Sequence, residues 1–176
     1  MRAILGCRPR GSMARECTAF TFRVSACVVV LGSCLTAAWA PAAEDFGDHT
    51  SATLTGKAWK ALAGGEHDKV AAFTGKCREL YAAEAQKQQK GLSDFLPADK
   101  AHSAWALNDV GTCLFIEAQS LEKQGRKADA AAAYRKLTTS LGFAQCWDPK
   151  GWFWRPAEAA ADRLKQLEFD AVLDAK

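Results

Sequence analysis

The densest group of chemically distinctive residues in this chain lies between residues 146 and 156. Three of the six tryptophans fall within this segment: Trp147, Trp152 and Trp154. The sequence between the first two, at residues 148–151, predicts a turn, because proline suits its second position and glycine its fourth. Exposed indole faces beside such a turn could stack on sugar rings or clamp an extended peptide, and Lys150 or Arg155 would add a cation. The segment is therefore a candidate recognition platform.

The same tryptophans have a structural interpretation. Each aromatic ring buries about 150–250 Å² when it packs into a core. Three such rings near the end of a small domain would form an apolar plug that closes a stack of helices. The two interpretations differ in how much of each indole remains exposed, and both hold if one tryptophan stays at the edge.

Three of the seven cysteines follow residue 42, namely Cys77, Cys113 and Cys146. In an oxidising compartment an odd number permits one disulfide and leaves one free thiol, and the spacing leaves all three pairings open. The wide separations do not resemble a zinc pattern, which needs Cys-x-x-Cys pairs. The three residues are equally typical of small apolar side chains in a core.

Other patterns that carry chemistry are missing from the sequence. The histidines, His49, His67 and His102, stand at no metal-ligand spacing. No serine lies in a Gly-x-Ser-x-Gly context, and the chain has no phosphate-binding loop or dinucleotide fingerprint. The acidic residues are scattered, and no pair suggests glycoside hydrolysis. We therefore expect a protein that is not an enzyme and needs no metal or cofactor.

The first 42 residues have the organisation of a secretory signal. Five arginines precede a short apolar run at residues 24–35, and a small-residue region at 36–43 follows. The apolar run is shorter than the roughly 20 residues of a spanning helix, although an uncleaved signal anchor is one alternative. Cleavage before Ala43 would export residues 43–176, to the periplasm or outside the cell.

A second processing site competes with this one. Leu31-Gly32-Ser33-Cys34 is similar to a bacterial lipobox. Cys34 would then carry a lipid and anchor an outer-membrane lipoprotein. Contact with a membrane is expected only through such an anchor.

The charge distribution argues against nucleic-acid binding. Residues 1–42 contain five basic residues, all of them arginines, and one acidic residue. Residues 43–176 contain 18 basic and 19 acidic residues. A nucleic-acid-binding domain shows a concentrated basic footprint, and the near-neutral body lacks one.

From Ser51 onward the apolar residues recur at three- and four-residue spacing, which is the helical period. We expect one all-α domain with helices at 50–63, 67–89, 101–123, 127–140 and 156–173. The stretch 91–100 is expected to be a loop and 141–155 an irregular aromatic segment. No strand is predicted.

An internal repeat emerges when Gly65 is aligned with Gly125. Small and apolar residues then correspond in pairs: Leu54 with Leu114, Ala58 with Ala118, Ala61 with Leu121, Val70 with Ala130, Thr74 with Tyr134 and Cys77 with Leu137. Small side chains let two antiparallel helices approach closely, and each glycine marks the turn between them. The sequence thus predicts two helical hairpins.

This pattern resembles the tetratricopeptide repeat family, most closely over residues 114–137. The unit at 54–77 departs from it, because Thr74 stands where an aromatic residue is expected and Val70 replaces alanine. The resemblance covers residues 50–140 and implies antiparallel hairpins with a C-terminal capping helix. The two glycines are 60 residues apart, so the units do not form a regular array.

The resemblance also implies a groove lined by helices 50–63 and 103–123. Its candidate lining residues are Lys57, Lys60, Asn108 and Glu117, and the Asn108 amide is a candidate clamp for a bound peptide. We therefore expect an exported interaction scaffold or adaptor that binds an unidentified protein or peptide. The alternative is an accessory protein that binds carbohydrate or cell-wall glycan through the tryptophan-rich segment.

Overall fold

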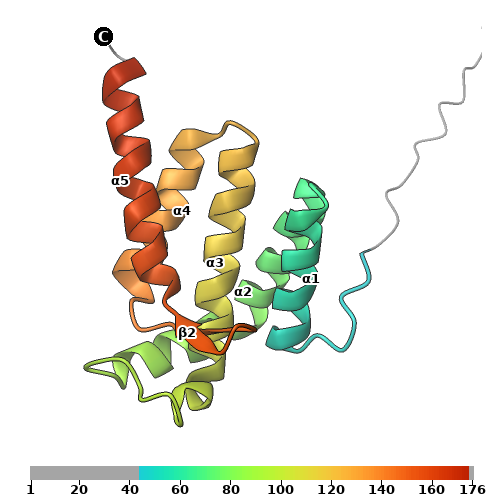
Figure 1. Cartoon of the computed structure of the whole chain (residues 1–176). Helices are drawn as coiled ribbons and strands as arrows, with labels where there is room; N and C mark the ends of the chain where they lie inside the picture. Colours follow the sequence, from blue (N-terminus) through green and yellow to red (C-terminus); the bar gives the residue numbers. More distant parts are fainter. Residues whose placement is uncertain (1–43, 175–176) are drawn as a thin grey trace, which may run out of the picture. The chain divides into compact units, whose positions relative to one another are not determined.

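A computed structural model describes residues 44–174 (Figure 1). The expected signal segment and its candidate lipid anchor, Cys34, lie outside these residues. The elements in chain order are α1 (Ser51–Ala63), α2 (His67–Lys90), a short 3-10 helix η1 (Ala101–Ala104), α3 (Trp105–Lys123), α4 (Lys127–Ser140), β1 (Cys146–Asp148), β2 (Trp152–Trp154) and α5 (Pro156–Asp174).

The predicted all-α class is confirmed, and the five expected helices are found close to their expected positions. The prediction that the chain has no strand is wrong, because β1 and β2 form a small antiparallel hairpin. Local geometry explains the hairpin: Gly151 adopts a φ of 97°, and its N–H donates to the Asp148 carbonyl over 2.9 Å. The Asp148 carboxylate also accepts the Lys150 N–H over 2.8 Å. The tight turn reverses the chain and aligns the aromatic residues on both sides.

The turns after α1 and α3 share one hydrogen-bond pattern. Gly65 and Gly125 have φ values of 71° and 75°, in the left-handed region that glycine tolerates. The N–H of Glu66 donates to the Ala61 carbonyl over 2.9 Å, and that of Arg126 donates to Leu121 over the same distance. The two glycines aligned from the sequence therefore occupy equivalent positions.

The residues expected at the helix crossings lie in the core. Nearly all are buried, among them Leu54, Ala58, Leu114, Ala118, Ala130, Tyr134 and Leu137. Thr74 is also buried, and its hydroxyl donates to the Val70 carbonyl over 2.9 Å. A threonine is tolerated there because the helix backbone satisfies its polar atom.

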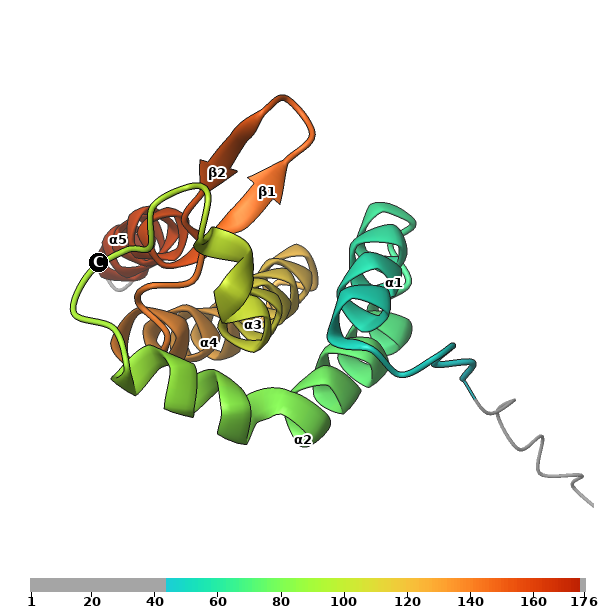
Figure 2. The same cartoon turned by 90° about the horizontal axis from the view of Figure 1, so that it is seen from below.

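The β-hairpin projects from one side of the domain, and α1 and α5 flank it (Figure 2). α1, α3 and α5 face that side, with α2 behind α1 and α3 (Figure 1). Seen from below, the hairpin lies between α1 and α5, in front of α3 (Figure 2). This arrangement brings the tryptophan-rich segment onto the face that the three helices share.

Candidate functional site

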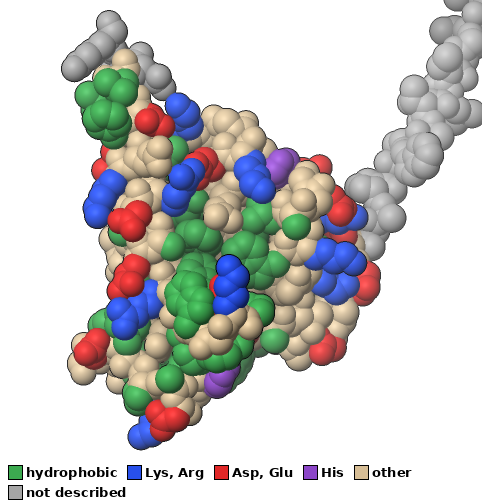
Figure 3. Space-filling view, viewed as in Figure 1, with side chains coloured by type: hydrophobic (Ala, Val, Ile, Leu, Met, Phe, Trp, Pro, Cys, Tyr) green, Lys and Arg blue, Asp and Glu red, His purple; other side chains and the backbone are tan. Residues whose placement is uncertain are grey.

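A groove of about 610 Å³ opens between α1, α5 and the hairpin, over α3. Its aromatic lining residues are Trp59, Phe115, Trp147, Trp152 and Trp154, and the others are Cys146, Asp148, Arg155, Glu158, Ala159 and Asp162. We call this set the aromatic groove. Apolar side chains gather over the middle of this face (Figure 3). The volume falls within the range of pockets that hold small ligands or a few side chains of a partner.

The hairpin register decides which side chains share a face. Asp148 lies directly opposite Trp152, and Cys146 lies opposite Trp154. Side chains two residues apart on a strand point the same way, and directly paired residues share a face. These four side chains therefore form one face of the hairpin, and Trp147 lies on the other.

The three tryptophans of the hairpin play different parts. Trp154 is partly buried, with its ring centroid 5.1 Å from that of Phe115 and 6.4 Å from that of Trp59. Trp147 and Trp152, by contrast, are 50% and 53% exposed. Trp154 thus acts as the plug that the sequence suggested, while the other two indoles remain open to solvent.

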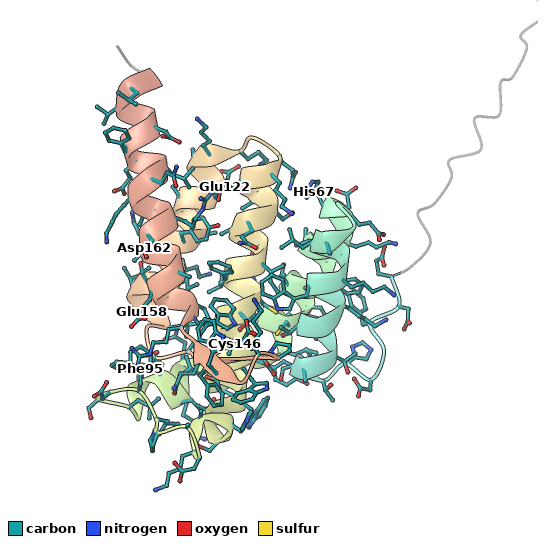
Figure 4. The ribbon with its side chains drawn as sticks, viewed as in Figure 1. His67, Phe95, Glu122, Cys146, Glu158 and Asp162 are labelled. Carbon is teal, nitrogen blue, oxygen red and sulfur yellow. The ribbon has the colours of Figure 1, made fainter. Side chains whose placement is uncertain are left out.

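The polar lining of the groove is mainly acidic. Asp148, Glu158 and Asp162 contribute three carboxylates against the single guanidinium of Arg155, which gives a formal charge of −2. Glu158 and Asp162 come from α5 (Figure 4). Arg155 is already engaged, because it donates to Glu158 over 2.8 Å and lies 3.8 Å from the centroid of the Phe95 ring.

Asp162 and Asp148 differ in their partners. Asp162 pairs with Lys165 over 3.3 Å, but both side chains are largely exposed, so this pair contributes little. Within residues 44–174, Asp148 has no ion-pair partner. It is the carboxylate of the groove with no cationic side chain beside it.

The three cysteines of the described residues are free and occupy two places. Cys77 and Cys113 are fully buried, and Cys113 Sγ lies 3.3 Å from Thr55 Oγ1. A hydrogen bond with the Cys77 thiol, together with burial, raises the pKa of Cys113 well above its ordinary value. Cys146 lies apart from them in the groove, and burial raises its pKa as well. Neither Cys113 nor Cys146 is an activated thiolate, because activation requires a lowered pKa.

A second cavity of about 320 Å³ lies beside the hairpin and is lined in part by His102, Trp105, Asp109 and Phe153. The His102 ring packs against Phe153 with centroids 5.3 Å apart. Ser51 Oγ donates to Asp109 Oδ2 over 2.5 Å and connects α1 to α3. Burial raises the pKa of Asp109 above its usual 3.8, and the Ser51 hydrogen bond only partly opposes this effect.

Replacement of Asp109 tests this burial through the pH dependence of stability. A carboxyl whose pKa is raised by folding binds more protons in the folded state, so its stabilisation is lost as pH rises above 3.8 through the raised pKa. We expect Asp109→Asn to gain stability relative to the wild type as the pH rises above 3.8. Thermal unfolding across this range checks the prediction, with the exposed Glu79→Gln as control. Parallel curves for Asp109→Asn and the wild type would contradict it.

The four groove residues implied by the family resemblance are not brought together. Lys57 pairs with Asp45 over 3.1 Å, and Lys60 lines the same small cavity beside the segment before α1. Glu117 pairs with Arg78 of α2 over 3.0 Å. None of these residues lines the aromatic groove.

The expectation that the Asn108 amide clamps a bound peptide is wrong. It is buried, its amide nitrogen donates to the Ala101 carbonyl over 2.8 Å, and its amide oxygen accepts the Gln145 N–H over 2.8 Å. Both halves of the amide therefore hold η1 and the segment before β1 in place. Asn108 is a structural clamp within the domain and presents no free amide to a peptide.

Sequence reasoning found the hairpin residues of the groove and missed those on the helices. Trp59, Phe115, Glu158 and Asp162 had not been singled out. Glu158 and Asp162 carried a usable signal, since an i, i+4 pair lies on one face of a helix. For Trp59 and Phe115, the helical spacing identifies the apolar face of the helix on which each lies. It does not identify the segment that packs against that face.

The comparisons with known proteins give no family: no family model, curated protein or solved structure matches the chain. Among the helices of residues 44–174, none combines the length and the apolar composition that a membrane-spanning helix needs. Nor does this part of the chain group three His, Cys, Asp or Glu residues where they could hold a metal ion.

Proposed function

We propose that this chain is an exported, non-catalytic interaction scaffold whose aromatic groove holds a segment of a partner protein. The observation that carries the proposal is that two half-exposed tryptophans, Trp152 and, from the other face of the hairpin, Trp147, both line a groove walled by helices. Tryptophan is enriched among the residues that dominate binding energy at interfaces. Large apolar side chains exposed together at a concave site are typical of interaction surfaces.

We also propose that the helices follow a tetratricopeptide-like plan, with α1–α2 and α3–α4 as the hairpins and α5 as the cap. The equivalent turns at Gly65 and Gly125 and the buried alanines at the crossings support it. The first helix of each hairpin contributes one side chain to the aromatic groove, Trp59 from α1 and Phe115 from α3, although the lining residues that the resemblance implies are not among them. The long α2, which ends at Lys90, and the following loop account for the irregular spacing of the two units.

The proposed absence of catalysis is supported by the chemistry of the groove. Cys146 has a raised pKa and is a poor nucleophile at neutral pH. The groove carboxylates lie on an open surface, and none of the described residues that line the groove is a histidine. The proposed export depends on the signal-like pattern of residues 1–42.

A library of random short peptides displayed on phage tests the proposed function. We expect selected peptides to lose about 2 kcal/mol of binding free energy, or roughly thirtyfold in affinity, on Trp152→Ala. Leu80→Ala is the matched control, because it removes a similarly exposed apolar side chain from α2 outside the groove. Alkylation of Cys146 at alkaline pH should block the same peptides, while the buried Cys77 and Cys113 are protected.

The proposal is overturned if no peptide is selected, or if binding survives both Trp152→Ala and alkylation of Cys146. The variants should first be shown to unfold at the same temperature as the wild type. A loss of binding in Leu80→Ala as well would also contradict the assignment of the groove.

A second candidate function is recognition of carbohydrate. The cross-strand pair of Trp152 and Asp148 offers an indole face for a sugar ring and a carboxylate that can accept from its hydroxyls. Soluble cell-wall oligosaccharides should then shift the tryptophan fluorescence of the wild type. The shift should be smaller in Trp152→Phe. Such a result without peptide binding would favour the glycan function over the scaffold.

A further inference from the structure

We propose that the partner segment is cationic, and that a lysine or arginine side chain of the partner binds between the indole of Trp152 and the carboxylate of Asp148. This inference rests on the proposed function, because it names the chemistry of the segment that the aromatic groove would hold. It adds a charge and a pair of contact residues that the scaffold proposal leaves open.

The first argument is the charge of the groove. Its lining carries a formal charge of −2, and Arg155, its one cation, is held by Glu158 and stacked on Phe95. The lining includes no asparagine, glutamine, serine or threonine. A neutral polar ligand would therefore find few matched side-chain partners, whereas a cation would compensate the carboxylates.

The second argument is the geometry of the hairpin. Asp148 and Trp152 are directly paired across the strands, which places their Cβ atoms about 4.5–5.5 Å apart on one face. A cation over the indole face would therefore remain within reach of the carboxylate. Cation–π contacts favour tryptophan above the other aromatic residues, and the 53% exposure of Trp152 leaves its ring accessible.

The third argument is the apolar floor of the groove. Lysine and arginine carry aliphatic stems that pack on apolar surface while the charged head reaches a polar partner. Phe115, Trp59 and Trp154 provide that surface behind the hairpin pair. Arg155 on the Phe95 ring is an example of the same mode within this domain.

The Asp148 carboxylate can bind a cation of the partner because it forms no ion pair within residues 44–174. Lys150, at the tip of the same hairpin, donates its backbone N–H to Asp148 and forms no ion pair within residues 44–174. The negative charge of Asp148 is therefore available to a partner. An asparagine at this position would still accept the Lys150 N–H and maintain the turn.

Binding of oligolysine and oligoglutamate of equal length, both with capped ends, tests the inference with the full chain. We expect oligolysine to bind and oligoglutamate not to bind, with affinity that falls as salt is added. Asp148→Asn should weaken oligolysine binding about fivefold, and Trp152→Ala by at least as much. Glu79→Gln removes one negative charge from the exposed face of α2 and should leave affinity unchanged.

Several outcomes separate this inference from the proposed function. If Asp148→Asn and Glu79→Gln weaken oligolysine equally, or neither does, attraction is non-specific and the cationic assignment is overturned. If neutral peptides bind with the same dependence on Trp152 while oligolysine does not, the cationic assignment fails but the scaffold stands. If no peptide of any charge binds and cell-wall oligosaccharides do, both proposals fail.

Discussion

Replacement of Tyr134 with alanine is expected to lower the free energy of unfolding by about 3–5 kcal/mol. Tyr134 of α4 is the largest of the fully buried side chains of the domain. Its ring centroid lies 5.7 Å from that of Phe115, so the same ring supports the floor of the aromatic groove. The substitution leaves a cavity at the crossing of α3 and α4. Urea denaturation followed by far-ultraviolet circular dichroism measures the loss.

Tyr134→Phe is the matched control for this prediction. It retains the ring and removes only the hydroxyl, which donates to Glu122 Oε2 over 3.1 Å, so we expect a loss of about 1 kcal/mol. Glu122 keeps its ion pair with Arg163 in this variant. An alanine variant within 1 kcal/mol of the wild type would show that the crossing is not packed as described.

The tyrosine also gives a pH signature. Burial raises the pKa of Tyr134 from 10.0 to about 12. The folded state therefore binds more protons than the unfolded state between these values, so this contribution to stability is lost as pH rises from 10.0 to about 12. Tyr134→Phe should lack this part of the alkaline loss of stability.

Gly111→Val should have the second largest effect, a loss of about 3 kcal/mol. A Cβ built on Gly111 of α3 would lie 2.6 Å from the Ala144 Cβ and 3.6 Å from Leu137 Cδ1. The alanine Cβ is fixed to its backbone and cannot swing away as the end of a long side chain could. The segment that leads into β1 would therefore have to move, and with it the hairpin of the groove. Thermal and urea unfolding check the loss.

The same substitution at Gly56 provides the control. Gly56 lies in α1, and no atom would come within 4 Å of a Cβ there. Valine and glycine differ by less than about 0.5 kcal/mol in helix propensity, so Gly56→Val should leave stability nearly unchanged. Equal losses at Gly56 and Gly111 would contradict the close approach of α3 to Ala144.

If Gly111→Val still folds at low temperature, it also probes the site. The displaced Ala144 segment leads directly to Cys146 and Trp147, so groove peptides should bind more weakly to this variant than to Gly56→Val. Unchanged peptide binding would place the binding surface outside the hairpin.

The sequence by itself determined the helices and the turns that connect them. Helical periodicity, the turn glycines at 65 and 125, and the Asp-Pro-Lys-Gly turn are local, because each depends on residues within a few positions of one another. The sequence also located the tryptophan-rich segment. It missed the two three-residue strands, which are too short for a periodic signal, and it did not separate the 3-10 helix η1 from α3.

Only the tertiary structure decided which side chains meet at the site. Trp59 reaches Trp154 across 95 positions of the chain, and the packing of α1 and α5 around α3 brings them together. It also buried Asn108, which looked available, and left Trp147 and Trp152 half exposed when the sequence allowed either state. Periodicity identifies the face of an element that is apolar, whereas exposure depends on what packs against that face, and here the packing is set by contacts between residues distant in the chain.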